Sequence, residues 1–135
     1  MNPASPRSGS QIRQIEDSAR SLGLKLQIVK ASAGDDLDSA FTSLRQSGAG
    51  ALLLATDPSL NAIQKQIAEL AAHYVMPTMA ASRDFVSRGG LLSYGASLPD
   101  SFRQAGAYTG RILKGEKPSD LPVLQPTKFD FVINL

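Results

Sequence analysis

Hydrophobic and polar residues along the chain follow two different spacings. Apolar residues spaced three and four apart predict helices over about 10–22, 37–48, 60–73 and 99–114. Shorter apolar or alternating runs predict strands at 25–29, 51–55, 75–80, 91–94 and 129–135, with a short helix or turn at 82–88. Strands that alternate with helices are typical of an α/β fold. We therefore predict a three-layer α/β/α arrangement around a mainly parallel sheet.

The rest of the sequence is organised around residues 50–58, which read Gly-Ala-Leu-Leu-Leu-Ala-Thr-Asp-Pro. The apolar run 51–55 does not alternate, so we expect a strand that is covered on both faces. Asp57 and Pro58 end this run, and a helical pattern follows directly. Open α/β sheets bind ligands at the carboxyl ends of their strands. We therefore expect the function of the chain at this acidic loop.

The first predicted helix has no strand before it, although each helix of such a fold crosses between two parallel strands. In a flavodoxin-like strand order, the preceding strand would lie between 25–29 and 51–55. We expect this first strand to be absent, which leaves unpaired ladder edges and favours association. The chain would then form a homodimer, exchange a strand, or place residues 129–135 in the vacant position.

Composition narrows the function classes. The 135 residues suit one domain, and 14 basic against 12 acidic residues give a net charge of +2, which is spread along the chain. Nucleic acid is therefore not an expected partner, because phosphate binding needs clustered cations. The chain has no cysteine, which excludes disulfides and thiolate chemistry. The first ten residues lack the apolar segment of a signal peptide, and no run is long enough for a membrane helix.

Several motifs in the same order carry a family resemblance. They are Asn2-Pro3, the "A…LGL" ending at 19–24, "AFTSL" at 40–44, "ALLLATDP" at 51–58, "GGLLSYG" at 89–95 and the long match from "RQAGAYTG" at 103 to the end of the chain. With these motifs the chain resembles the solute-binding proteins of ABC transporters that have the type I periplasmic-binding fold. More narrowly, it resembles the branch that includes tryptophan- and tyrosine-type amino-acid binders.

This resemblance implies a receptor of two α/β lobes hinged around a buried ligand, about twice as long as this chain. It implies that residues 1–94 form the second lobe without its first strand, and that 95–135 are the return crossing helix and closing strand. The two parts are treated as one unit, whose crossing helix would pack on the absent lobe. The implied partners are a small polar solute and the membrane permease of an importer. The implied location of the full-length parent is periplasmic or extracytoplasmic.

Asp57 is the first candidate ligand-binding residue. A carboxylate at the end of a buried strand can pair with the ammonium group of an amino acid. Relatives that take amino acids have an acidic residue in the matching loop. Many follow it with aromatic residues, where this chain has Ser59 and Leu60. Ser59 is therefore also a candidate, and a stacked aromatic ligand is less favoured. An equally weighted interpretation is that Asp57 caps the third helix, and both roles can hold.

Five further residues are candidates for the same site. Asn2, Ser5 and Ser8 precede or begin the first helix, whose free N–H groups would suit a carboxylate; helix capping is the simpler explanation of each. Arg83 follows the 75–80 strand and could hold a carboxylate with two hydrogen bonds, or it could pair with Asp84 on the surface. Tyr94 lies near the expected hinge and could line the cleft or belong to the core.

No arrangement in the sequence indicates catalysis, and we expect no metal or cofactor. The single histidine, His73, has no companion ligands at metal-binding spacing. The glycines form neither a dinucleotide fingerprint nor a P-loop, and no serine lies in a nucleophile elbow. The alternative to a receptor fragment is a self-contained flavodoxin-like regulatory or enzymatic domain. Such a domain would supply its own strand between 25–29 and 51–55.

Overall fold

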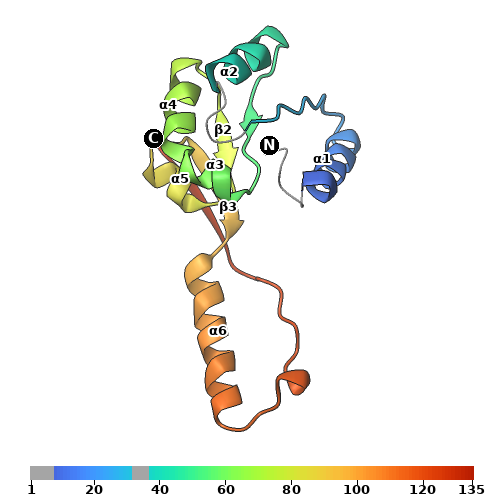
Figure 1. The fold of residues 1–135 in the computed structure, drawn as a ribbon, viewed down its shortest axis with the longest axis vertical. Helices are drawn as coiled ribbons and strands as arrows, with labels where there is room; N and C mark the ends of the chain where they lie inside the picture. Colours follow the sequence, from blue (N-terminus) through green and yellow to red (C-terminus); the bar gives the residue numbers. More distant parts are fainter. Residues whose placement is uncertain (1–7, 32–36) are drawn as a thin grey trace.

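The computed structural model describes residues 8–31 and 37–135, and it has an α/β body with a helical arm (Figure 1). The helices and strands are α1 (Ser8–Ser21), α2 (Leu37–Gln46), β1 (Leu52–Leu53), α3 (Pro58–Ala62), α4 (Gln64–His73), β2 (Thr78–Ala80), α5 (Arg83–Ser87), β3 (Leu92–Ala96), α6 (Leu98–Leu113), a 3₁₀ turn (Pro118–Asp120) and β4 (Phe129–Ile133).

The sheet has four strands in the order β1-β2-β3-β4. The first three strands are parallel, and β4 is antiparallel to β3. The register places Leu53 beside Met79, Met79 beside Leu92, and Tyr94 beside Phe131. The predicted α/β class with a mainly parallel sheet is therefore confirmed. The expectation that residues 129–135 fill a gap beside β1 is wrong, because β4 pairs at the opposite edge of the sheet.

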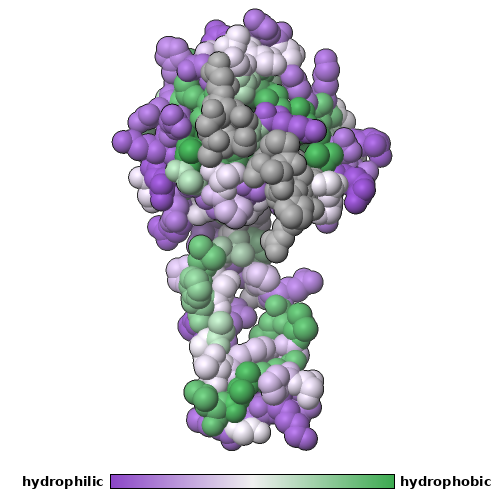
Figure 2. Space-filling model, viewed as in Figure 1, coloured by the Kyte–Doolittle hydropathy of each residue, from purple (hydrophilic) through white to green (hydrophobic). Residues whose placement is uncertain are grey.

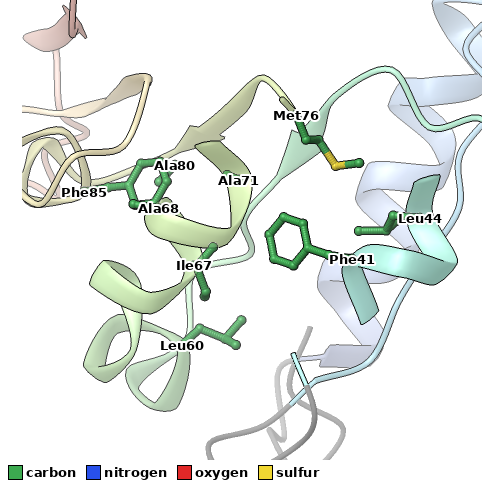
Figure 3. Close-up of a cluster of buried hydrophobic side chains, with 9 residues drawn as sticks. All are labelled: Phe41, Leu44, Leu60, Ile67, Ala68, Ala71, Met76, Ala80 and Phe85. Atoms are coloured by element: carbon green, nitrogen blue, oxygen red, sulfur yellow. The ribbon is translucent and has the colours of Figure 1, made fainter. Parts of the chain in front are cut away.

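The hydrophobic core lies between one face of the sheet and the helices α2, α4 and α5. Its members share almost complete burial and come from these helices, from α3, from β2 and from the segment just before β2 (Figure 3): Phe41, Leu44, Leu60, Ile67, Ala68, Ala71, Met76, Ala80 and Phe85. Phe85 of α5 is fully buried, and an added Cβ at Gly90 would lie 2.2 Å from its ring. This glycine is therefore needed for α5 to close on the sheet.

The other face of the sheet is apolar and exposed. Leu53 is 54% exposed, and its neighbours in the register include exposed residues of β3 and β4. The exposed side chains on this face belong to Leu53, Tyr94, Phe129, Phe131 and Ile133. The expectation that the 51–55 strand is covered on both faces is therefore wrong for the described chain. The run does not alternate because the apolar Leu53 points to the face of the sheet that no described element covers.

Residues 25–29 form no strand in the structure, although their side chains alternate. Val29 packs against the core cluster instead, and Leu26 is exposed. The only described strand beside β1 is β2, so the strand that a self-contained flavodoxin-like domain would need is not found among residues 8–31 and 37–135. This finding counts against that alternative.

The predicted third helix is divided at Ile63, where α3 ends and α4 begins. The remaining helices begin and end within about two residues of the predicted bounds. Gly23, Gly48 and Gly115 follow α1, α2 and α6 with positive φ, as the sequence pattern indicates for helix ends. None of the helices in the described part of the chain is long and apolar enough to cross a bilayer.

An arm made of α6 and residues 114–128 extends away from the body (Figure 1). It is a closed hairpin: the Tyr108 hydroxyl donates to the carbonyl of Pro122 at 2.6 Å, and Arg111 pairs with Glu116. The pair with Glu116 raises the pKa of Arg111 and lowers that of Glu116. Figure 2 shows apolar residues along the surface of this arm.

The predicted division of the chain after residue 94 stays a prediction. In the structure β3 runs through this point to Ala96, and the arm begins directly after it. The closing strand β4 returns to the body, as the sequence pattern indicates.

Candidate functional site

A cavity of about 590 Å³ lies where the parallel strands end. It is lined by residues 54–56 after β1, residues 80–84 after β2, and Gly95 and Ala96 at the end of β3, with Asn61, Gln64, Leu98, Pro99 and Asp130 completing the wall. All three parallel strands present their carboxyl ends to this space. This is the position at which open α/β sheets bind ligands, and it is where the sequence predicts a site.

Asp57 lies directly after the cavity-lining residue Thr56 and is 5% exposed. It is the N-cap of α3, because its Oδ1 accepts hydrogen bonds from the backbone N–H of Ser59 at 2.9 Å and from the Ser59 hydroxyl at 2.5 Å. The capping interpretation is thus confirmed, and the structure brings Asp57 and Ser59 together. Neither residue is part of the cavity wall.

Among the candidates that the structure describes, Arg83 is the one that lines the cavity. It begins α5, whose N-cap Ser82 accepts a hydrogen bond from the N–H of Asp84 at 3.2 Å. The alternative of an Arg83–Asp84 ion pair is not found, and among the described residues the Arg83 guanidinium has no hydrogen-bond or ion-pair partner. An unpaired guanidinium at the cavity is available for an anionic group.

The predictions for Asn2 and Ser5 lie outside the described residues, and for Ser8 the structure describes only the backbone at the start of α1. One contact places this helix close to the cavity. The Gln11 side-chain amide lies 3.5 Å from the carbonyl oxygen of Thr56. The beginning of α1 is therefore near the loop that carries Asp57.

Tyr94 does not line the cavity. Its ring stacks on Phe129 with centroids 5.6 Å apart and meets Phe131 edge-on at 6.4 Å, on the exposed face of the sheet. The structure thus separates Tyr94 from Arg83 and Asp57. The sequence interpretation of Tyr94 as a core residue also differs from this position, since the ring is half-exposed.

Sequence reasoning missed Gln64, Asn61 and Asp130. Gln64 lines the cavity although it is only 3% exposed, and its amide nitrogen donates to the Asn61 side-chain oxygen at 3.0 Å. Asp130 lies between two phenylalanines in an alternating strand. The alternation places its side chain on the face opposite the phenylalanines, so the period of β4 could have identified it.

The cavity wall combines both charges with neutral hydrogen-bonding groups. Arg83 supplies a cation, Asp84 and Asp130 supply carboxylates, and Asn61 and Gln64 supply amides, while residues 54, 55, 80 and 81 are apolar. Such a surface suits a small polar molecule that carries charges of both signs. Among the described residues no group of three or more His, Cys, Asp or Glu side chains is placed to hold a metal ion.

Solved structures share this fold. A conserved domain protein from Vibrio cholerae aligns with a TM-score of 0.81 at 24% identity, over 98% of this chain and 44% of that one. A ligand-free, open substrate-binding protein with adhesive properties from Clostridium difficile aligns at 0.78 and 22%, over 98% and 45%. An ABC domain in complex with L-Trp from Streptococcus pneumoniae aligns at 0.76 and 22%, over 98% and 45%.

These matches show the fold, and the chain spans less than half the length of each structure. No curated protein sequence matches the chain significantly. The sequence model of one family, described as ABC transporter substrate binding protein, matches residues 1–135. The cavity at the strand ends, the shared fold and this match along the whole chain lead to one conclusion: the chain belongs to the ABC transporter substrate-binding protein family.

Proposed function

We propose that the chain supplies one side of the ligand cleft of a solute receptor for an ABC importer. The solute would be a small polar molecule, an amino acid or a related carboxylate. The observation that carries this proposal is the 590 Å³ cavity at the strand ends with the unpaired Arg83 guanidinium in its wall. The L-Trp in the related Streptococcus pneumoniae structure is consistent with an amino acid as the solute class.

Arg83 would bind the solute carboxylate, because a guanidinium matches a carboxylate with two parallel hydrogen bonds. Asp57, held by Ser59, would face the ammonium group when the cleft closes. Asn2, Ser5 and Ser8 would support the carboxylate from the start of α1; the support for these three residues is the sequence alone. Tyr94 would act from the hinge side of the lobe, next to the base of the arm.

Closure of a hinge between two lobes would trap the solute, because contacts to both lobes stabilise the closed state. The second lobe would come from the rest of a longer parent, and the arm of residues 98–128 would be the crossing between the lobes. The exposed apolar residues of α6 support this role, since they need a partner surface. We expect no catalysis and no cofactor.

The parent receptor would deliver its solute to a membrane permease from the periplasmic or extracytoplasmic side. Association of this chain through the free edge of β1 stays a prediction. Leu52 and Leu54 donate their N–H groups to β2, and β1 is two residues long, so the free edge offers only a short template for a further strand.

Thermal-shift and calorimetric titration of the full-length parent with the common amino acids would test the proposal. Arg83→Gln should weaken binding of the best carboxylate ligand about 10–100-fold, because a hydrogen bond to a charged group contributes about 1.5–3 kcal/mol. Arg88→Gln is the matched control, since Arg88 ends the same helix away from the cavity. Equal binding by both variants would contradict the role of Arg83.

The isolated 135-residue chain should bind the same ligand weakly, because the proposal places the other half of the cleft in the rest of a longer parent. Micromolar binding by this chain alone would show that its own cavity is sufficient. That result would overturn the hinge mechanism while leaving the cavity as a binding site.

A further inference from the structure

Asp130 is a half-buried carboxylate in the wall of the cavity, and no described group neutralises it. The ion pairs between described residues do not include it, and its side chain accepts no hydrogen bond from them. Arg83 lines the same cavity without reaching ion-pair distance of Asp130. A charge that is partly withdrawn from water is costly unless it is paired, so this carboxylate is suited to a cationic group of a ligand.

The register of β3 and β4 determines what lies beside this carboxylate. Asp130 is paired with Gly95, and residues directly opposite in an antiparallel pair point to the same face of the sheet. At Gly95 an added Cβ would lie 2.0 Å from the carbonyl oxygen of Ala81. Since the Cβ positions of such a pair are about 4.5–5.5 Å apart, the Ala81 oxygen lies within about 7.5 Å of the Asp130 Cβ.

The Ala81 carbonyl is a second hydrogen-bond acceptor in this part of the wall. Ala81 follows the last residue of β2 and lines the cavity, and its oxygen accepts no hydrogen bond from the described residues. A nitrogen that donates to this oxygen and to the Asp130 carboxylate would lie about 2.9 Å from each, and the positions of the two groups allow this. Two acceptors, one of them anionic, favour a cationic donor over a neutral or anionic group.

The charges of the whole wall also favour a cation. The wall has one cationic side chain, Arg83, and two carboxylates, Asp84 and Asp130, while Asp57 directly follows the wall residue Thr56. In the function proposed above, Arg83 binds the solute carboxylate and Asp57 faces its α-ammonium group. A solute without another charge would leave Asp130 unpaired in the closed cleft, and a second cationic nitrogen removes that cost.

We propose that Asp130 and the Ala81 carbonyl bind a side-chain cationic nitrogen of the solute, so that the solute is a basic amino acid. This inference rests on the proposed function and names the class of amino acid. The apolar wall residues Leu54, Ala55 and Ala80 suit the methylene groups between the two ends of such a molecule. Among the described residues the cavity wall has no aromatic side chain, which favours an aliphatic solute over a stacked ring.

Matched pairs of amino acids test for the cationic nitrogen itself. The pairs are L-lysine with L-norleucine, L-ornithine with L-norvaline, and L-arginine with L-citrulline, whose members have similar chains and differ in the charge at the end. In calorimetric titration of the full-length parent, the cationic member of at least one pair should bind about 10–100-fold more tightly. L-Glutamate should bind more weakly than any of these, since it would bring a further carboxylate to Asp130.

Asp130→Asn tests where the nitrogen binds. It should weaken the cationic member of the preferred pair at least about tenfold more than the neutral member, because only the cationic member uses the carboxylate. Asp130→Glu keeps the charge and should retain the preference. Asp17→Asn is the matched control, because Asp17 is exposed on α1 outside the cavity wall. The ratios in the unaltered parent need no variant, so they test the proposal even where a substitution impairs folding.

Arg83→Gln separates this inference from the proposed function, because it should weaken both members of a pair and leave their ratio unchanged. If neutral amino acids bind as tightly as cationic ones and Asp130→Asn changes nothing, the receptor role stands and this inference is overturned. A preference for the cation that survives Asp130→Asn would also overturn it, since another group would then hold the nitrogen. If no amino acid binds, the proposed function fails and this inference fails with it.

Discussion

Asp100 and Lys128 join the two chain segments at the base of the arm, with the Lys128 Nζ 3.2 Å from the Asp100 Oδ1. Asp100 lies in the first turn of α6 and also accepts hydrogen bonds from Arg103 at 2.7 Å and Gln104 at 2.6 Å. The N–H of Ser97 donates to the carbonyl of Lys128 beside this pair. One nearly buried carboxylate therefore connects the start of the arm with its end.

Neutralising this carboxylate should loosen the base of the arm. Asp100→Asn removes the charge that Arg103 and Lys128 contact, so we expect faster amide hydrogen exchange at the base, around Ser97 and Lys128. Asp17→Asn is the matched control, because the Asp17–Arg20 pair is exposed and such pairs contribute little. Equal exchange at the arm base in both variants would show that the backbone alone fixes it.

Acid should have the same effect as this substitution. Hydrogen bonds from Arg103, Gln104 and Lys128 lower the pKa of Asp100 from 3.8 to about 2. The folded-state pKa is the lower one, so the contribution to stability is present at neutral pH and is lost as the pH falls from about 4 to about 2. Carbon-detected NMR titration of the carboxyl groups should place Asp100 at the acid end of the series. A midpoint near 4 would contradict the role of its partners.

Asp57 has a structural role that can be separated from its proposed ligand contact. Asp57→Ala should lower the free energy of unfolding by about 1 kcal/mol, because the N-cap of α3 is lost. Asp57→Ser should restore most of this stability, since serine caps helices without a charge. If Asp57 also binds solute, Asp57→Ser will fold normally in the full-length parent and bind an amino acid more weakly. Urea denaturation and calorimetric titration would measure the two effects separately.

Val75 has a backbone conformation that disfavours a branched side chain. Its φ is +50°, in the left-handed region, and its side chain is 83% exposed. Val75→Asn should raise the free energy of unfolding by about 1 kcal/mol, because asparagine tolerates this region and no packing is lost. Val123→Asn is the control, since Val123 is exposed without positive φ. Equal unfolding midpoints for the two variants would refute this account.

Gly95 lies where β3 passes close to the end of β2. An added Cβ would lie 2.0 Å from the carbonyl oxygen of Ala81. Gly95→Ala should therefore cost about 1–3 kcal/mol, because two backbones would have to move apart. Gly106→Ala is a suitable control, since an added Cβ there meets no atom within 4 Å. A thermal unfolding midpoint unchanged by Gly95→Ala would show that the strands are free to separate.

The sequence predicted the elements that carry their own local signals. The spacing of apolar residues predicted α1, α2, α4 and α6, and glycines marked the ends of α1, α2 and α6. Apolar runs bounded by turn residues predicted the four strands. The failures share a physical cause, which is that burial is a property of the assembled protein. Residues 25–29 alternate as a strand does, yet pairing requires a neighbouring strand that the described chain does not supply. The non-alternating 51–55 run predicted two covered faces, but only one is covered.

The site was predicted by position more than by residue. The strand–loop–helix pattern pointed to the strand ends, and the cavity lies there. Arg83, three residues after the end of β2, lines this cavity, while its role in binding stays a prediction. Gln64 was missed because a glutamine in an amphipathic helix ordinarily faces solvent. Asp57 lies near the cavity, and its carboxylate caps α3. The sequence alone does not distinguish this capping role from a role in ligand binding. Asp130 was overlooked because the two phenylalanines beside it dominated the interpretation of β4.

The close approach at Gly95 also limits how the cavity can evolve. At Gly95 the cavity wall is main chain, and an added Cβ there would lie 2.0 Å from the carbonyl oxygen of Ala81. A side chain cannot readily be introduced at this point of the wall, whereas the exposed Arg83 and Asp84 can be replaced without disturbing the core. Proteins of this fold that bind different solutes should therefore keep a glycine at this position and differ at the positions of Arg83 and Asp84.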